Sequence, residues 1–187
     1  MKIIGLDLSL NKAGVAAIDG DASIYQAETL RTPQKVIAAG AHARLEWVRS
    51  GIDERVQRVK PDAAVVEAPA YGAKGTAVHQ LAGLWWIITH DLWKLGVPYV
   101  SISPGSCKLY ASGDGSADKD AMILATARAF GDFDGDNNAA DALWLAHMGA
   151  DHYGQPLVEV AGKKRRGTLV GTKANPIQWP VLSAGGA

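Results

Sequence analysis

Three carboxylates stand where the surrounding sequence is apolar. Asp7 lies in an apolar run near the N-terminus, Glu67 ends the run AAVVE, and Asp141 lies near the start of AADALWLAHMGA. A buried carboxylate without a partner is costly because its charge loses water, whereas several that converge are stabilised by a hard cation that prefers oxygen ligands. Each acid alone could cap a turn or a helix, or pair with a lysine. The three together favour a metal site.

The elements that must position these acids follow from hydrophobic periodicity and turn residues. Apolar runs bounded by turn signals predict strands at 2–8, 14–18, 23–30, 63–67 and 98–102. Helical spacing predicts helices at 34–60, 76–95, 104–111, 117–130 and 139–150, with Ser116 as the N-cap of the fourth. This order predicts an α/β fold with a five-stranded mixed sheet and helices on both faces. Asp7 and Glu67 then lie on strands, and Asp141 lies in the first turn of the last helix.

Composition narrows the class of protein. The chain has 187 residues, 48% of them hydrophobic, and a single cysteine, which excludes an internal disulfide framework and a multi-cysteine zinc site. Its longest apolar run is too short to span a bilayer, and the N-terminus lacks the pattern of a signal peptide. We therefore expect a cytoplasmic protein without a membrane partner, in the host cytoplasm if a phage encodes it.

The formal net charge of +0 conceals an asymmetry. Residues 161–187 contain five basic side chains and no acid, while the other 160 residues contain 14 basic and 19 acidic side chains. Beyond residue 153 the sequence is rich in Gly, Pro, Lys and Arg and shows no sustained period. We therefore expect a folded domain at 1–152 and a basic, flexible tail at 153–187.

Four segments carry a resemblance to a known family. IIGLDLSLNKAGVAAID, VVEAP, SADK and NAADALWLAHMG span residues 3–149 and resemble, in order and spacing, the RuvC-type Holliday junction resolvases of the RNase H-like (retroviral integrase) superfamily, in a phage or actinobacterial form. The resemblance implies an RNase H-like fold and a structure-selective endonuclease that cuts four-way junctions and other branched DNA in pairs. It also implies two Mg²⁺ ions per active site, replaceable by Mn²⁺, and a homodimer formed through the 76–95 helix.

The resemblance also assigns roles to residues. Asp7 would bridge the two ions, Glu67 and Asp141 would flank them, and Lys119 in SADK would stabilise charge on the scissile phosphate. Lys108 matches a second functional lysine, although an ordinary surface lysine is an equally good interpretation. Further DNA contacts are expected from Tyr71, which would stack on unpaired bases, and from Lys74, Lys163, Lys164, Arg165 and Arg166. A packing tyrosine and a solubilising tail remain the plain alternatives.

One position departs from the family pattern. The family has two acids one turn apart in a D-A-A-D motif, whereas residues 138–141 here read N-A-A-D. Asn138 and Asp141 still share a helix face, and the Asn138 carbonyl can ligate a hard cation, but it brings no charge. Asp136 in the preceding loop is the other candidate for the fourth ligand. We expect weaker affinity for one of the two ions before DNA binds.

Other interpretations stay open at this point. The Asn138 substitution suits a resolvase-like protein that binds branched DNA without cutting it. The opening strands also suit a fragment of an actin-like ATPase, although Ser9 replaces the glycine usual there. DFDGDNN begins like a calcium loop but lacks its later Gly and Glu, so we expect a solvated loop. Trp85, Trp86 and Trp93 are expected in the core, with a dimer interface as the alternative.

Overall fold

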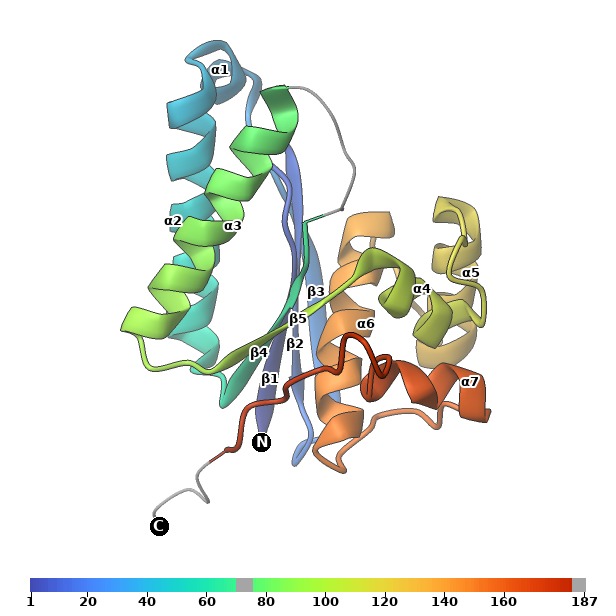
Figure 1. Ribbon diagram of the computed structural model, residues 1–187. Coiled ribbons are helices and arrows are strands. Elements are labelled where there is room, and N and C mark those ends of the chain that lie inside the picture. The colour runs from blue at the N-terminus through green and yellow to red at the C-terminus, as the bar shows by residue number, and fades with distance from the viewer. Residues whose placement is uncertain (70–75, 183–187) are drawn as a thin grey trace.

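A computed structural model describes residues 1–69 and 76–182, and its centre is one five-stranded sheet (Figure 1). The strand order is β3-β2-β1-β4-β5, with β1 antiparallel to β2, β2 antiparallel to β3, and the β1–β4 and β4–β5 pairs parallel. The strand bounds are β1 Lys2–Asp7, β2 Lys12–Asp19, β3 Ile24–Arg31, β4 Ala63–Glu67 and β5 Tyr99–Ile102. The predicted five-stranded mixed sheet is therefore confirmed.

Helices cover both faces of the sheet, as predicted (Figure 1). One face carries α1 Gln34–Ala38, α2 Ala41–Val59 and α3 Thr76–Lys94. The other carries α4 Pro104–Ser112, α5 Lys119–Phe130, α6 Asn137–His152 and the short α7 Lys163–Arg166, followed by the 3-10 helix η1 Gly167–Leu169. No helix among the described residues is long and apolar enough to cross a membrane.

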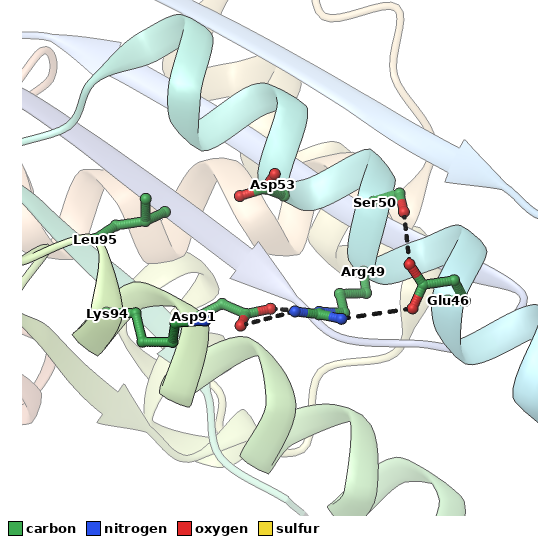
Figure 2. A pocket seen from close by; sticks show the side chains of 7 residues that line it. All are labelled: Glu46, Arg49, Ser50, Asp53, Asp91, Lys94 and Leu95. Atoms are coloured by element: carbon green, nitrogen blue, oxygen red, sulfur yellow. Dashed lines mark hydrogen bonds and ion pairs between the residues drawn. The ribbon is translucent and has the colours of Figure 1, made fainter.

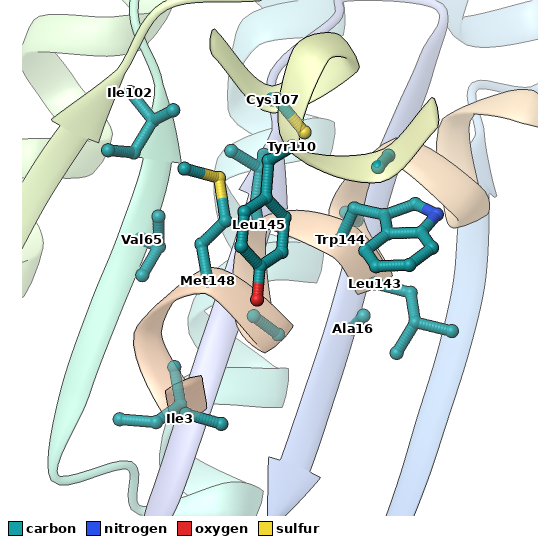
Figure 3. Packing of buried hydrophobic residues seen from close by; sticks show 14 of the residues in the cluster. Ile3, Ala16, Val65, Ile102, Cys107, Tyr110, Leu143, Trp144, Leu145 and Met148 are labelled. Carbon is teal, nitrogen blue, oxygen red and sulfur yellow. The ribbon is translucent and has the colours of Figure 1, made fainter. Parts of the chain in front are cut away.

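Side-chain alternation divides the core into two layers. Ile3 and Val65 face α6, whereas Ile4 and Val66 face α2 and α3. Burying both faces of β1 and β4 explains why their sequences are continuously apolar. Figure 3 shows the α6 layer, where Tyr110 and Trp144 meet edge to face at 5.9 Å between ring centroids.

Glycines in the sheet let α6 approach unusually closely. A Cβ atom on Gly5 would lie 2.1 Å from the Ala142 carbonyl oxygen, and one on Gly14 would lie 2.0 Å from the Asn138 carbonyl oxygen. Both distances are far inside van der Waals contact, so side chains there would push the helix outward. The two glycines thus place the N-terminal half of α6 directly on β1 and β2.

Helix boundaries differ from the prediction in three places. The expected helix at 34–60 is divided at Gly40, whose φ of 101° breaks the helical path. The fourth helix is capped by Asp118, which accepts a hydrogen bond from the Ala121 N–H at 2.8 Å, while Ser116 bonds to Asp114 instead. The last helix begins at Asn137, so Asp141 lies in its second turn rather than its first.

The tryptophans of α3 correct another expectation. Trp85 is partly buried, but Trp86 and Trp93 are 67% and 71% exposed. The expected core location is therefore wrong for two of the three. Their spacing of seven residues places them on one face of the helix.

The C-terminal segment, residues 153–182, packs against the α4–α6 side of the molecule (Figure 1). Val160 and Leu169 are buried, and Trp179 stacks on His152 at 4.3 Å between ring centroids. The Trp179 indole N–H also donates to the Leu169 carbonyl at 2.6 Å. This packing differs from the predicted flexible tail, because scattered apolar residues make contacts that no sequence period reveals.

A cavity of about 320 Å³ lies between α2 and α3 (Figure 2). The Arg49 guanidinium crosses it to Asp91 at 2.6 Å and reaches Glu46 at 3.6 Å. Its charged lining joins the two helices on the face of the sheet away from α6. The carboxylates singled out from the sequence lie on the α6 face, so this cavity is not their site.

Candidate active site

Strand register brings Asp7 and Glu67 together. The last paired residues of the parallel β1 and β4 strands are Leu6 and Val66, so the two acids follow on adjacent strand ends. Asp7 shares the parity of Ile3, and Glu67 shares that of Val65, so both point to the α6 face. Their carboxyl groups are close neighbours, and each alters the pKa of the other.

Asp141 approaches the same place from α6. Asp7 pairs with Gly14 in the sheet, and Gly14 lies under the Asn138 carbonyl, three residues before Asp141. The Oδ1 atom of Asp141 is buried and has no hydrogen-bond partner among the described residues. The three acids are therefore neighbours near the carboxyl ends of β1 and β4, each close enough to alter the pKa of another; their convergence on one metal stays a prediction.

Their pKa values show how unfavourable three charges are here. Burial raises the pKa of Asp7 well above its ordinary range, and Glu67 and Asp136 raise it further. Burial also raises the pKa of Glu67, although the hydrogen bond from Asp7 opposes this. Burial and then the charge of Asp7 raise the pKa of Asp141 to about 7. Three ionised carboxylates are therefore unfavourable here without a compensating positive charge.

Asp136 is engaged elsewhere. It caps α6 by accepting from the Asn138 and Ala139 N–H groups, and it also binds the Thr29 hydroxyl and Arg31 Nη2, the latter at 2.5 Å. Burial acts to raise its pKa, but these hydrogen bonds and the Arg31 charge outweigh burial and lower it. Asp136 is therefore an ionised cap near Asp7 whose oxygens already have partners.

Asn138 remains the other candidate for the fourth position. Its side-chain Nδ2 donates to Asp136 Oδ1 at 3.5 Å, and its Oδ1 accepts from Asn137 at 3.4 Å. Both contacts are long, so they hold the amide weakly. Its role as a ligand stays a prediction.

Two lysines supply positive charge to the carboxylates. Burial raises the pKa values of all three acids, and the lysine charges partly oppose this: Lys108 on α4 acts on Glu67 and Asp141, and Lys119 at the start of α5 acts on Asp7 and Asp141. Lys119 is exposed and Lys108 is partly buried. Both predicted lysines therefore lie at the carboxylate cluster.

The remaining predicted DNA contacts divide into groups. Tyr71 and Lys74 fall outside the described residues. Lys163 and Lys164 are exposed, and Lys164 lies close enough to Asp114 to help lower its pKa, after the larger effect of Ser116. Arg165 and Arg166 instead bond to the protein itself: Arg165 to carbonyls of α4, and Arg166 to Asp151.

The donor set fits a hard cation. All three acids offer oxygen ligands, and the buried Asp141 Oδ1 has no partner in the described part of the chain, so a bound ion would supply one. Within residues 1–69 and 76–182, no three His, Cys, Asp or Glu side chains are already gathered as around a bound ion. The three carboxylates are therefore near neighbours rather than a formed coordination shell.

A buried polar network beside the site was missed by the sequence interpretation. The Tyr110 hydroxyl donates to Asp151 Oδ2 at 2.7 Å and lies 2.9 Å from His147 Nδ1. The one available signal was the spacing of His147 and Asp151, four residues apart on an apolar helix. Nothing in the sequence indicated that Tyr110 would join them.

The curated relatives of this chain share one name, RuvC crossover junction endodeoxyribonuclease. No family model matches the chain. RuvC crossover junction endodeoxyribonuclease from Frankia alni is 31% identical over 159 residues, which cover 78% of this chain and 76% of that protein. The RuvC of Gloeobacter violaceus is 29% identical over 164 residues, covering 86% of this chain and 94% of the relative.

Solved structures of RuvC have the same fold as this chain. Thermus thermophilus RuvC in complex with Holliday junction substrate superimposes with a TM-score of 0.66 at 20% identity, covering 83% of this chain and 97% of that one. The Thermus thermophilus RuvC structure gives 0.63 over the same share of this chain. These matches confirm the predicted RNase H-like fold. The described fold and the curated relatives together show that the chain belongs to the RuvC family of crossover junction endodeoxyribonucleases.

Proposed function

We propose that this protein resolves Holliday junctions and other branched DNA by hydrolysing phosphodiester bonds in opposed strands. The observation that supports the proposal is the proximity of Asp7, Glu67 and Asp141, each of which alters the pKa of another. Relatives named crossover junction endodeoxyribonuclease and the junction complex of Thermus thermophilus RuvC support the substrate class. Because the chain belongs to the RuvC family, the alternative of an actin-like ATPase fragment is set aside.

Two Mg²⁺ ions, or Mn²⁺ in their place, would be held by Asp7, Glu67 and Asp141, with Asn138 contributing a neutral oxygen. When bound, the ions would lower the pKa of the attacking water and stabilise charge on the phosphoryl group. Three carboxylates bring about −3 against about +4, so the scissile phosphate completes the neutralisation. Ligand carboxyls must be deprotonated to bind the ions, and the raised pKa of Asp141 therefore couples ion binding to pH.

Lys119 and Lys108 would act on the phosphate electrostatically. The charge of each partly opposes the effect of burial on the pKa of Asp141, which supports a place for both near the phosphoryl group. A fixed cation stabilises the charge that develops in the transition state without needing to reorganise. Products with 5′-phosphate and 3′-hydroxyl ends are expected.

The DNA surface would extend beyond the cluster. Lys163 and Lys164 are exposed cations, and Lys164 lies by Asp114 in the loop that leads to Lys119. They suit contacts with backbone phosphates, which give affinity without sequence preference. Tyr71 would stack on unpaired bases and Lys74 would contact phosphate, both from the segment after Glu67.

A homodimer through α3 would supply the second active site. Trp86 and Trp93 expose large apolar surface on one helix face, and aromatic side chains of this kind are enriched in interfaces. A two-fold dimer presents two equivalent sites to two opposed strands of a four-way junction.

The direct test uses labelled four-way junctions with the purified protein in Mg²⁺ and in Mn²⁺. We expect paired nicks from wild type and intact DNA from Asp7→Asn. Asp134→Asn, which removes an exposed carboxylate from the loop before α6, serves as the matched control. Binding without cleavage in both metals would instead favour a non-cleaving branched-DNA protein. Cleavage by Asp7→Asn at the wild-type rate would contradict the proposed site.

A further inference from the structure

The C-terminal end of α4 is closed by a residue from outside the helix. The last carbonyls of a helix have no partner within it. Here the Gly113 N–H donates to the Leu109 carbonyl at 3.0 Å, whereas Arg165 donates from Nε to the Tyr110 carbonyl at 2.7 Å and from Nη2 to the Ala111 carbonyl at 2.6 Å. One guanidinium thus binds two successive carbonyls at the negative end of the helix dipole.

The neighbouring Arg166 anchors the same segment to α6. Its guanidinium lies 3.0 Å from the buried Asp151 carboxylate, which also accepts from the Tyr110 hydroxyl. His147 completes the network, because its Nε2 accepts from the Val158 N–H at 3.2 Å and its Nδ1 proton is then directed at Tyr110. Every member has a partner, and burial lowers the pKa of His147 to about 4, so the ring is neutral.

This arrangement bears on the active site through α4. Lys108 lies two residues before Tyr110, and the Cys107 sulfur lies 3.8 Å from the Asp141 carbonyl oxygen. The same short helix therefore connects Arg165 at one end with a lysine that acts on Glu67 and Asp141. A shift of α4 would move the Lys108 charge relative to the carboxylates.

We propose that Arg165 is a positioning residue of the nuclease site, which fixes the C-terminal end of α4 and so holds Lys108 at the carboxylates. The proposal rests on the proposed role of Lys108. It also separates the basic run into two pairs: Lys163 and Lys164 face solvent, whereas Arg165 and Arg166 bind the protein. Arg165 therefore has a role within the fold, while Arg166, whose side chain is 50% exposed, stays a predicted DNA contact as well.

The test is a double-mutant cycle on the full-length chain, read as the single-turnover cleavage rate at saturating junction. Arg165→Ala is expected to lower this rate by roughly 10- to 100-fold, the scale of a displaced catalytic group. In a Lys108→Ala background the same change is expected to alter the rate less than about two-fold, because the group it positions is gone. Junction affinity should stay near wild type in both backgrounds.

Controls separate positioning from folding and from binding. Lys173→Ala removes an exposed cation of the same segment and should leave the rate unchanged. Arg165→Lys keeps the charge but cannot span both carbonyls, so it should restore the rate only in part. If thermal melting shows that Arg165→Ala is not folded, Arg165→Lys replaces it in the same double-mutant cycle.

The outcomes are distinct. If Lys108→Ala alone cleaves at the wild-type rate, the proposed role of Lys108 fails, and with it the basis of this inference. If Lys108→Ala cleaves slowly and Arg165→Ala lowers the cleavage rate by the same factor in both backgrounds, Lys108 acts at the site but Arg165 does not position it. If Arg165→Ala binds the junction more weakly but cleaves at the wild-type rate at saturation, Arg165 contacts DNA and does not position Lys108.

Discussion

Replacing Asp141 by asparagine should stabilise the metal-free protein while abolishing cleavage. Burial and the Asp7 charge raise the pKa of Asp141 from 3.8 to about 7. Between these values the folded state binds more protons than the unfolded state, so stability falls as the pH rises from about 4 to about 7. At pH 8, where the group is ionised in both states, the raised pKa destabilises the folded state by at most about 4 kcal/mol. At pH 5 the folded carboxyl is protonated and the unfolded one is ionised, and the destabilisation is about 2 kcal/mol. Water and local rearrangement reduce both figures.

Urea unfolding in EDTA at pH 5 and pH 8 measures this effect. Asp141→Asn keeps the side-chain shape and removes the charge, so its gain in unfolding free energy should be larger at pH 8. Asp134→Asn should change stability by less than about 0.5 kcal/mol at either pH, because it is exposed. Mg²⁺ should stabilise wild type at pH 8 by binding the folded state and should do little for Asp141→Asn. A variant no more stable than wild type at pH 8, or a gain equal at both pH values, would refute the reasoning.

Three further changes test other parts of the molecule. Gly5→Ala places a Cβ against the main chain of α6 and should lower the unfolding free energy by about 1–3 kcal/mol or more, measured by urea titration. Trp86→Glu with Trp93→Glu should shift the protein from dimer to monomer in sedimentation velocity and turn paired cuts into single nicks. Lys163→Glu with Lys164→Glu should weaken junction binding and reduce the slope of log K against log salt by roughly 0.9 for each phosphate that the protein no longer neutralises.

Each of these has a result that counts against it. Wild-type stability of Gly5→Ala would mean that α6 does not rest on β1 as closely as described. An unchanged sedimentation coefficient would remove α3 from the dimer interface. An unchanged salt slope, measured in an Asp7→Asn background so that DNA stays intact, would show that the exposed lysines do not contact phosphate.

The strands and two of the three acids could be predicted because their signals are local. Strand alternation fixes the face to which a side chain points, and in a parallel pair the ends of β1 and β4 lie together. Asp7 and Glu67 therefore converge once the strand order is known. Asp141 was selected from its place at the start of an apolar helix and then matched to the family pattern, but no local rule states where that helix rests on the sheet.

The parts that escaped prediction depend on long-range packing. Gly5 and Gly14 appear in the sequence as ordinary strand residues, yet they decide how closely α6 approaches. The C-terminal segment has no hydrophobic period, because its contacts with the core come from isolated residues at irregular spacing: Val160, Leu169 and Trp179. Four basic residues in a row gave no hint that the first two would face solvent and the next two would bind the protein.

The single cysteine gives this molecule its own reporter. Cys107 is 3% exposed on α4, and burial, followed by the charges of Asp141 and Glu67, raises the pKa of its thiol well above the ordinary value. A buried neutral thiol does not react with alkylating reagents until the structure around it opens. The alkylation rate therefore measures how often α4 lifts from α6. Without any engineered label, this rate reports how strongly the segment containing Arg165 stabilises the packing of α4 on α6. It also reports how much bound metal or DNA reduces the opening of α4.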